Sequence, residues 1–506
     1  MADEATVGVG PSVSRTSSRR HGTKGKRGVG PHGQASWFSC VVNLVNTIVG
    51  AGALAMPRAM SQMGIVLGVF VILWSGTTAG FGLYLQSRCA QYLERGSASF
   101  FALSQITYPN AAVIFDAAIA IKCFGVGVSY LIIIGDLMPG VVEGFAGGSP
   151  TYEFLLDRHF WVTAFMLVII PLSYLRRLDS LKYTSIAALA SMGYLVILVL
   201  YNFIKGDTLP DRGPVRIIHW AGAVPTLSSL PVIVFAFTCH QNMFSILNEI
   251  SDNSHFKTTS VVFSSIGSSA TTYILIAITG YLSFGNSVGG NIVGMYPPGL
   301  YATIGRAAIV MLVMFSYPLQ CHPCRASVDA VLRWRPKSSS IGNDGSPHRH
   351  PLLGARGNRN REHMSDLRFA LITTSILILS YIVAITVSSL EAVLAYVGST
   401  GSTSISFILP GLFYYKISDP DSPTQQGLMK EDDEAGDDFL SDDEDAQSHG
   451  TAGSPQVSRL TDSGLLRCSG RWRRELLRKL SLALVVYGLL IMIVCLVTNT
   501  FFIASH

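Results

Sequence analysis

Long apolar stretches recur along almost the whole chain, and they constrain its fold more than any other feature. Eleven of them come near the roughly 20 residues that an α-helix needs to cross a bilayer core of about 30 Å. They lie at 37–60, 65–87, 111–140, 160–175, 181–204, 219–248, 259–283, 299–321, 367–388, 391–415 and 480–503. Only 14% of the residues are charged, against about a quarter in soluble domains. The sequence therefore predicts an all-α integral membrane protein with about eleven transmembrane helices.

Three polar segments interrupt the apolar pattern and divide the chain. Residues 1–36 form a basic tail, residues 333–366 a basic loop, and residues 417–470 an acidic loop. Their composition predicts disorder, because such segments bury too little apolar surface to offset the entropy of ordering. We expect transmembrane helices 1–8, 9–10 and 11 in residues 37–332, 367–416 and 471–506, respectively.

Lysine and arginine gather in the polar segments and in alternate loops. With the N-terminus in the cytosol, the cytosolic side collects the cations around Arg19, Arg333 and Arg473, whereas the opposite side keeps scattered ones such as Arg58 and Arg158. Cytosolic loops of membrane proteins carry this excess of positive charge. We therefore expect the N-terminus and all three polar segments in the cytosol, and the C-terminus on the far side.

The first span carries a break at the depth where a plain membrane anchor would stay regular. Its middle reads Asn46-Thr47-Ile48-Val49-Gly50-Ala51-Gly52-Ala53. A helix that unwinds there frees backbone N–H and C=O groups, which then need a ligand or a protein partner. The plainer interpretation is a face of small residues that packs two helices together.

Span 219–248 carries a second interruption, which the packing interpretation does not explain. After Phe237 it places polar Thr238, His240, Gln241 and Asn242 inside the membrane, where such side chains are costly unless they line a cavity. Paired interruptions in corresponding helices of two halves indicate an inverted repeat. The first ten spans are thus predicted to form an inverted repeat of five plus five helices, in which helices 1 and 6 are broken. The eleventh span is predicted to be an accessory helix outside the repeat.

Motifs around both breaks and in three further spans resemble the amino acid/auxin permease family. They are Asn46–Gly52, Lys122–Tyr130, Phe235–His240, Tyr317–Arg325, and Val397–Thr403 followed by Phe407–Gly411. The resemblance covers all the spans and leaves out the polar segments. It implies eleven helices, the inverted five-helix repeat of the amino acid–polyamine–organocation superfamily, and proton-coupled or sodium-coupled amino acid transport. Within the family, the chain looks like the fungal vacuolar transporters of the AVT type.

An α-amino acid presents a carboxylate and an ammonium group, and the two breaks offer backbone groups for both. The N-terminus of the second half of span 1 suits the carboxylate, because a helix N-terminus carries partial positive charge. Glycine there allows close approach of the backbone, while freed carbonyls at both breaks suit the ammonium. The expected substrate site comprises Thr47, Ile48, Gly50, Ala51, Gly52, Ser129, Tyr130, Phe237, Thr238 and Cys239.

The third span adds a stripe of polar residues spaced seven apart, namely Lys122, Ser129 and Asp136. This spacing keeps them close to one face of a helix. A cation inside the membrane is costly, so Lys122 is expected to face the bundle interior and to meet carbonyls or a carboxylate. It either locks helices together or takes part in ion coupling.

Proton coupling needs a titratable group that is exposed alternately to the two sides. Glu391, at the start of the tenth span, is the leading candidate, followed by His240. The plainer interpretations are an exposed loop carboxylate and a histidine satisfied in a packed helix end. Sodium would need a cage of oxygens, for which Thr47 and Ser316 offer hydroxyls. Because Ser316 is the one hydroxyl side chain in the middle of span 299–321, this span offers few ligands for sodium, and proton coupling is expected. The predicted coupling residues are Glu391, His240, Lys122, Asp136 and Ser316.

Other classes of function find little support in the sequence. There is no GxxxxGK[ST] motif, which excludes an ATP-driven pump with its own nucleotide domain. No charge ring or repeated pore motif favours a channel. Cys321-His322-Pro323-Cys324 has no second pair for zinc and is read as a helix end at Pro323. We expect no catalytic residues, metal or cofactor; an amino acid sensor on the same fold and a sodium-coupled symporter are the alternatives.

The expected partners are an amino acid substrate and the lipid bilayer, with no nucleic acid. The resemblance implies the vacuolar membrane, with the plasma membrane as the alternative. Flux toward the cytosol is favoured, and the sequence leaves its direction open. The acidic loop is either a solvated linker or a regulatory segment. Ser441 precedes Asp442-Asp443-Glu444, a context suited to an acid-directed kinase, and phosphate there would add roughly −1.5 to −2 charges.

Overall fold

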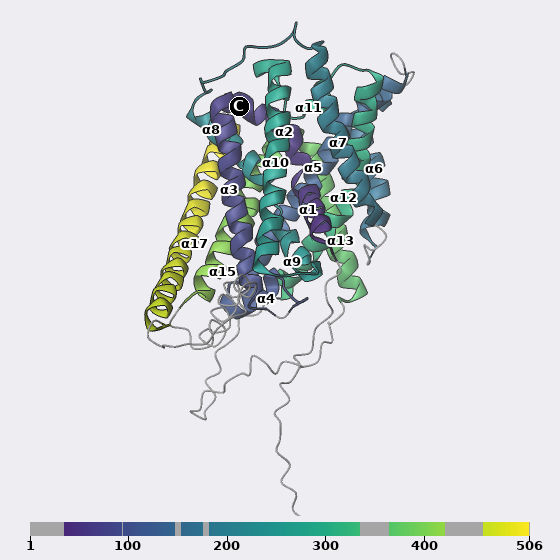
Figure 1. The fold of residues 1–506 in the computed structure, drawn as a ribbon. Coiled ribbons are helices and arrows are strands. Elements are labelled where there is room, and N and C mark those ends of the chain that lie inside the picture. Colours follow the sequence, from purple (N-terminus) through teal and green to yellow (C-terminus); the bar gives the residue numbers. More distant parts are fainter. Residues whose placement is uncertain are drawn as a thin grey trace, which may run out of the picture.

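The computed structural model describes residues 35–93, 95–146, 153–175, 182–333, 364–419 and 459–504. Helices make up most of them (Figure 1). The bounds are α1 Trp37–Ile48, α2 Ala51–Met63, α3 Ile65–Ala90, α4 Phe100–Thr107, α5 Ala112–Ala146, α6 Arg158–Ser173, α7 Lys182–Lys205, α8 Ala223–Ala236, α9 His240–Glu249, α10 His255–Phe284, α11 Ile292–Met295, α12 Leu300–Arg333, α13 Asp366–Thr386, α14 Leu390–Val397, α15 Leu409–Ile417 and α17 Arg459–Ala504. Short 3₁₀ turns lie at Glu153–Leu156 and Gly285–Ser287.

The helices account for the predicted spans. In the described residues, nine helical segments are long and apolar enough to cross a membrane, one of them formed by α8 and α9 together. Helices α1 and α2 form a further, bent span, and α6 is an apolar helix of 16 residues in the place of the short fourth span. The predicted all-helical membrane fold is therefore confirmed.

The eighth span extends well beyond its predicted end. Helix α12 continues through Pro318 and Pro323 to Arg333, so the prediction that Pro323 ends this helix is wrong. Proline is tolerated inside membrane helices, because neighbouring groups satisfy the backbone that it leaves unpaired. Cys321 and Cys324 are buried free cysteines within α12, and no metal-binding cluster exists among the described residues.

The two broken spans run in opposite directions. Figure 1 shows α2 near the top of the bundle and α1 below it, whereas α8 lies near the top and α9 near the bottom. The chain therefore ascends through span 1 and descends through span 6. Opposite directions in corresponding helices are what an inverted repeat requires.

The tenth span is less regular than its sequence suggested. Between α14 and α15 the chain forms two π-helical segments, Gly398–Ser402 and Ser404–Ile408. Thr403, between the two segments, donates a hydrogen bond to the carbonyl of Ser399 (2.8 Å), and Ser406 in the second segment donates one to the Thr238 hydroxyl (3.2 Å). Wider π turns are frequent at functional sites, and this one contacts the break of span 6.

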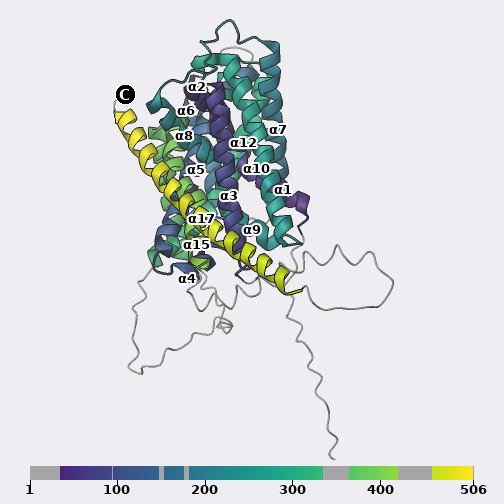
Figure 2. The same cartoon turned by 60° about the vertical axis from the view of Figure 1, so that its left-hand side comes forward.

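Helix α17 lies on the outside of the bundle and crosses it at a slant (Figure 2). It packs against α8 and α15. The contact with α15 is close, because a Cβ on Gly411 would lie 2.7 Å from the carbonyl oxygen of Ser481. The accessory helix predicted from the sequence is therefore attached mainly to the second half of the predicted repeat.

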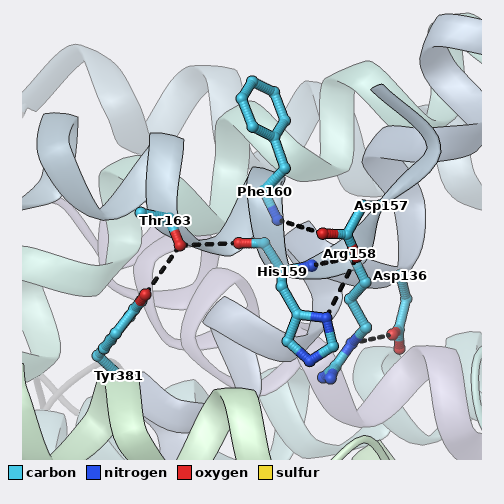
Figure 3. A network of polar contacts seen from close by, with 7 residues as sticks. All are labelled: Asp136, Asp157, Arg158, His159, Phe160, Thr163 and Tyr381. Atoms are coloured by element: carbon cyan, nitrogen blue, oxygen red, sulfur yellow. Dashed lines mark hydrogen bonds and ion pairs between the residues drawn. The ribbon is translucent and has the colours of Figure 1, made fainter. Parts of the chain in front are cut away.

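A polar network fixes the start of α6 (Figure 3). Arg158 donates to a carboxylate oxygen of Asp136 on α5 (3.1 Å), while Thr163 shares a hydrogen bond with Tyr381 on α13 (2.8 Å). Asp157 caps the helix and accepts from the backbone amide of His159 (3.1 Å). This hydrogen bond and that of the His159 ring lower the pKa of Asp157, so the capping carboxylate stays ionised to a lower pH than a free aspartate. The network holds three helices together at one end of the bundle.

Candidate functional site

The break in span 1 leaves backbone donors without partners. Helix α1 ends at Ile48, Gly50 adopts φ −142° and ψ −138°, and α2 begins at Ala51 with a bend of 56° between the two halves. The amides of Gly50, Ala51 and Gly52 donate to no described group, while the Ala53 amide closes the first turn on the Gly50 carbonyl (3.0 Å). Three free N–H groups at a helix N-terminus form a site for a carboxylate.

The break in span 6 lies between α8 and α9. Phe237, Thr238 and Cys239 connect the two helices and are 0–3% exposed. Thr238 donates its hydroxyl to the Val234 carbonyl (2.9 Å), so that side chain is satisfied locally. The helix interruption predicted at this position is thus confirmed, and its freed groups are backbone groups.

A tyrosine that the sequence analysis missed joins the two breaks. The hydroxyl of Tyr273 on α10 lies 2.6 Å from the carbonyl oxygen of Ile48 and 2.9 Å from that of Ala236. Its ring is fully buried and packs edge-on against Phe237, with centroids 5.2 Å apart. One hydroxyl therefore ties the end of α1 to the end of α8. A tyrosine in mid-span is the sequence signal that could have found it, because a buried hydroxyl needs a partner.

Close packing also joins the breaks. A Cβ on Gly52 would lie 2.6 Å from the Cβ of Ala236 and 2.9 Å from its Cα, whereas a Cβ on Gly50 would meet nothing within 4 Å. Glycine was expected at both positions to let a ligand approach the backbone. That reason fits Gly50, but Gly52 is needed because α2 and α8 touch there. Both the cavity and the packing interpretations of the sequence therefore apply, at different residues.

Thr47 is held between the two broken helices. Its hydroxyl donates to the Asn43 carbonyl (2.9 Å) and accepts from the side-chain amide of Asn242 on α9 (3.0 Å). Ser316 lies on α12, half-buried, and the described hydrogen bonds do not connect it to Thr47. A shared role of these hydroxyls in binding sodium stays a prediction.

The third span supplies the residues expected from it, but not the expected contacts. Ser129 is fully buried and donates to the Val126 carbonyl in its own helix (2.8 Å), and Tyr130 lies beside Gln320 of α12. Lys122 is 4% exposed, as predicted for a residue facing the interior. Lys122 makes no hydrogen bond or ion pair with any described residue. The prediction that Lys122 meets carbonyls or a carboxylate is therefore wrong for this part of the chain. Its backbone instead packs against Gly401.

His240 opens α9 in a fully buried position. One ring nitrogen, Nε2, lies 3.2 Å from the Ala79 carbonyl oxygen, and the other, Nδ1, has no partner. The backbone carbonyl of His240 accepts from the Gln86 side chain (2.8 Å). The histidine is therefore only half satisfied among the described residues.

Glu391 does not extend freely into solvent. Its carboxylate lies 3.4 Å from the Nε of Arg58 on α2, and Arg58 also donates to the Val288 carbonyl (3.3 Å). Both side chains are about one-third exposed and line a cavity of about 770 Å³. This cavity contains none of the residues at the two breaks. The leading coupling candidate therefore pairs with the half of span 1 that follows the break.

The other two predicted residues are placed apart from these groups or fall outside the structure. Asp136 forms its ion pair with Arg158, which also donates to the Val387 carbonyl (3.3 Å) ahead of α14 (Figure 3 shows the ion pair). A role for Asp136 in coupling stays a prediction. Ser441 lies outside the described residues.

Two oppositely directed, discontinuous membrane helices that meet at their breaks define a transporter of small solutes. Residues 33–432 match the family model described as transmembrane amino acid transporter protein, and the chain belongs to that family. The protein is thus an amino acid transporter and not an enzyme, and the family resemblance stated from the motifs is confirmed.

Relatives with curated names cover most of the chain. Vacuolar amino acid transporter 5 of Schizosaccharomyces pombe is 46% identical over 405 residues, which cover 79% of this chain and 90% of the relative. Vacuolar amino acid transporter 6 of Saccharomyces cerevisiae is 41% identical over 408 residues, or 76% of this chain and 90% of the relative.

A solved structure shows the same fold at low sequence identity. The crystal structure of MhsT in complex with L-phenylalanine superposes with a TM-score of 0.54 at 12% identity, covering 93% of this chain and 100% of the other. At this identity the likeness concerns the fold alone. It agrees with the broken-helix bundle described above.

Proposed function

We propose that this transporter moves amino acids together with protons out of the vacuole into the cytosol, and that the amino acid binds between the two breaks. The carrying observation is the set of free amides at Gly50, Ala51 and Gly52, beside an open space at Gly50. These amides receive the carboxylate. The carbonyls at Phe237 and Thr238, which no described donor occupies, receive the ammonium.

Protons are proposed over sodium because the oxygens around the breaks are already bonded. The Tyr273 hydroxyl donates to the carbonyls of Ile48 and Ala236, and the Asn242 side-chain amide donates to the Thr47 hydroxyl. A sodium ion would need several free oxygens around one point. Glu391 is the proposed proton carrier, since its ion pair with Arg58 links the charge of Glu391 to α2, the half of span 1 that follows the break. His240 is the second candidate.

The vacuolar membrane is proposed because the two fungal relatives carry the name vacuolar amino acid transporter. The lumen of a vacuole is acidic, so a proton symporter there runs toward the cytosol. In this orientation the N-terminus is cytosolic, which agrees with the distribution of lysine and arginine.

Uptake into proteoliposomes under an imposed proton gradient tests the coupling. We expect labelled amino acid to accumulate when the outside is acidic, to stop when a protonophore is added, and to be unaffected when choline replaces sodium. Accumulation that follows a sodium gradient and ignores protons would contradict the proposal, and binding without any flux would favour the sensor.

Substitution of Glu391 identifies the proton carrier. Glu391→Gln should flatten the dependence of uptake on pH, because the glutamine side chain keeps its size but cannot release a proton. Asp419→Asn is the matched control, since Asp419 also pairs with an arginine, is similarly exposed and is not a coupling candidate. An unchanged pH profile in Glu391→Gln would remove Glu391 from the mechanism and make His240 the carrier to test.

A further inference from the structure

The cavity beside Glu391 is separate from the breaks and has its own set of polar groups. It measures about 770 Å³ and lies among α2, α5, α8, α14 and α17. A free amino acid is several times smaller than this volume. Aliphatic side chains such as Ile121, Val128 and Val397 form much of its wall. We call this cavity the vestibule.

Polar atoms in the vestibule lack partners although they are buried. The hydroxyls of Ser228 and Ser229 on α8 and the side-chain Nδ2 of Asn499 on α17 make no hydrogen bond. Ser229 is 1% exposed and Asn499 is 4% exposed. Buried polar groups in proteins are nearly always paired, so each exception needs an explanation. A ligand with hydrogen-bonding groups would pair them.

The charges of the vestibule match a zwitterion. Arg58 and Glu391 both line it, and their distance of 3.4 Å is long for an ion pair between a guanidinium and a carboxylate. A carboxylate can bind Arg58 bidentately, while an ammonium group binds Glu391. The two charged ends of an α-amino acid therefore find opposite partners at one side of the cavity.

Asn499 has no structural task that would explain its position. The hydroxyl of its neighbour Thr498 donates a hydrogen bond to the Val494 carbonyl of the same helix (2.8 Å), as expected for a polar residue in a membrane helix. Asn499 instead contributes to the cavity wall from a helix outside the ten that form the repeat. An amide both donates and accepts, so it suits a side chain that ends in an amide or a hydroxyl.

We propose that the vestibule is a second amino acid subsite, in which Arg58 and Glu391 hold the zwitterion while Asn499 and Ser229 select amino acids with amide or hydroxyl side chains. The inference rests on the proposed function, since it concerns the same substrate as the site between the breaks. It gives α17 a part in specificity that its place outside the repeat does not suggest.

Uptake of labelled L-glutamine and L-leucine by the full-length protein in proteoliposomes tests this assignment. The two side chains have similar size and differ in the amide. We expect Asn499→Leu to raise the KM for glutamine roughly fivefold, the effect of losing one buried hydrogen bond, and to leave the KM for leucine unchanged. Thr498→Val is the matched control and should change neither value.

Ser229→Ala keeps the test decisive if Asn499→Leu fails to fold, because it removes one hydroxyl and nothing else; it should raise the glutamine KM in the same direction. Equal KM values for glutamine in the wild type and in both variants would overturn the subsite. So would leucine uptake by a wild type that takes up no glutamine, and this result would leave the proposed function intact. No uptake of any of the twenty amino acids would instead contradict the proposed function.

Discussion

Gly52→Ala should lower amino acid uptake at least tenfold while the protein still inserts into the membrane. The added Cβ would lie 2.6 Å from the Cβ of Ala236, so α2 and α8 must move apart at the point where the two breaks meet. Overpacking of this kind costs roughly 1–3 kcal/mol. Alanine is otherwise the better helix former by about 1 kcal/mol, so a loss of activity cannot come from helix propensity. Initial uptake rates, normalised to the amount of protein in the liposomes, measure the effect.

A second substitution shows whether the contact itself is responsible. Gly52→Ala combined with Ala236→Gly moves the methyl group to the other helix and should restore much of the lost uptake. Gly267→Ala is the matched control, since a Cβ there meets nothing within 4 Å in α10. Normal uptake by Gly52→Ala, or a double variant as inactive as the single one, would contradict the close approach of α2 and α8.

Tyr273→Phe should also reduce uptake at least tenfold. The phenyl ring fills the same space, but the carbonyls of Ile48 and Ala236 lose their shared donor. A buried acceptor left unpaired costs roughly 1–3 kcal/mol, and here the loss falls on the two helix ends that must hold their geometry around the substrate. Uptake rates and thermal stability are measured on the same samples. Together they distinguish displaced helix ends from a loss of folding.

Tyr281→Phe serves as the control for the tyrosine. Tyr281 is equally buried on the same helix, and its hydroxyl donates to Asn286 (2.8 Å) and accepts from the Arg216 amide (2.7 Å), away from the breaks. We expect it to affect stability more than uptake. If both variants lost uptake in proportion to stability, Tyr273 would be an ordinary structural residue and not the link between the breaks.

The sequence predicted the features that depend on local chemistry. Apolar length fixed the number of spans, and the Gly50-Ala51-Gly52 run and the polar cluster after Phe237 located both helix breaks within a residue or two. These features follow from the cost of polar groups and irregular backbone in a membrane. No tertiary contact is needed to read them.

The sequence could not predict contacts between distant residues. Arg58 looked like one scattered cation, and Glu391 was the leading coupling candidate but was given no partner. The structure pairs these two residues, which stand 333 positions apart. Tyr273 stands 225 positions from Ile48; its place in mid-span indicates that its hydroxyl needs a partner, but not which one. Lys122 was given a partner because a buried cation needs one, but the structure packs it against Gly401. These pairings depend on which helices pack side by side, and hydropathy does not predict that packing.

The π-helical stretch of the tenth span shows a third kind of limit. Its sequence, from Gly398 to Ile408, reads as an ordinary membrane helix rich in serine and threonine. The first π-helical segment packs against α5 and α8, and periodicity alone does not reveal these contacts.

An experimental structure with a bound amino acid tests the central claim most directly. The protein would be saturated with whichever of the twenty amino acids it takes up fastest, and the ligand located by electron cryomicroscopy. The account predicts its carboxylate within about 3 Å of the amides of Gly50, Ala51 and Gly52, with the ammonium toward Phe237 and Thr238. A map in which the transported amino acid binds while these three amides stay free of it would contradict the account.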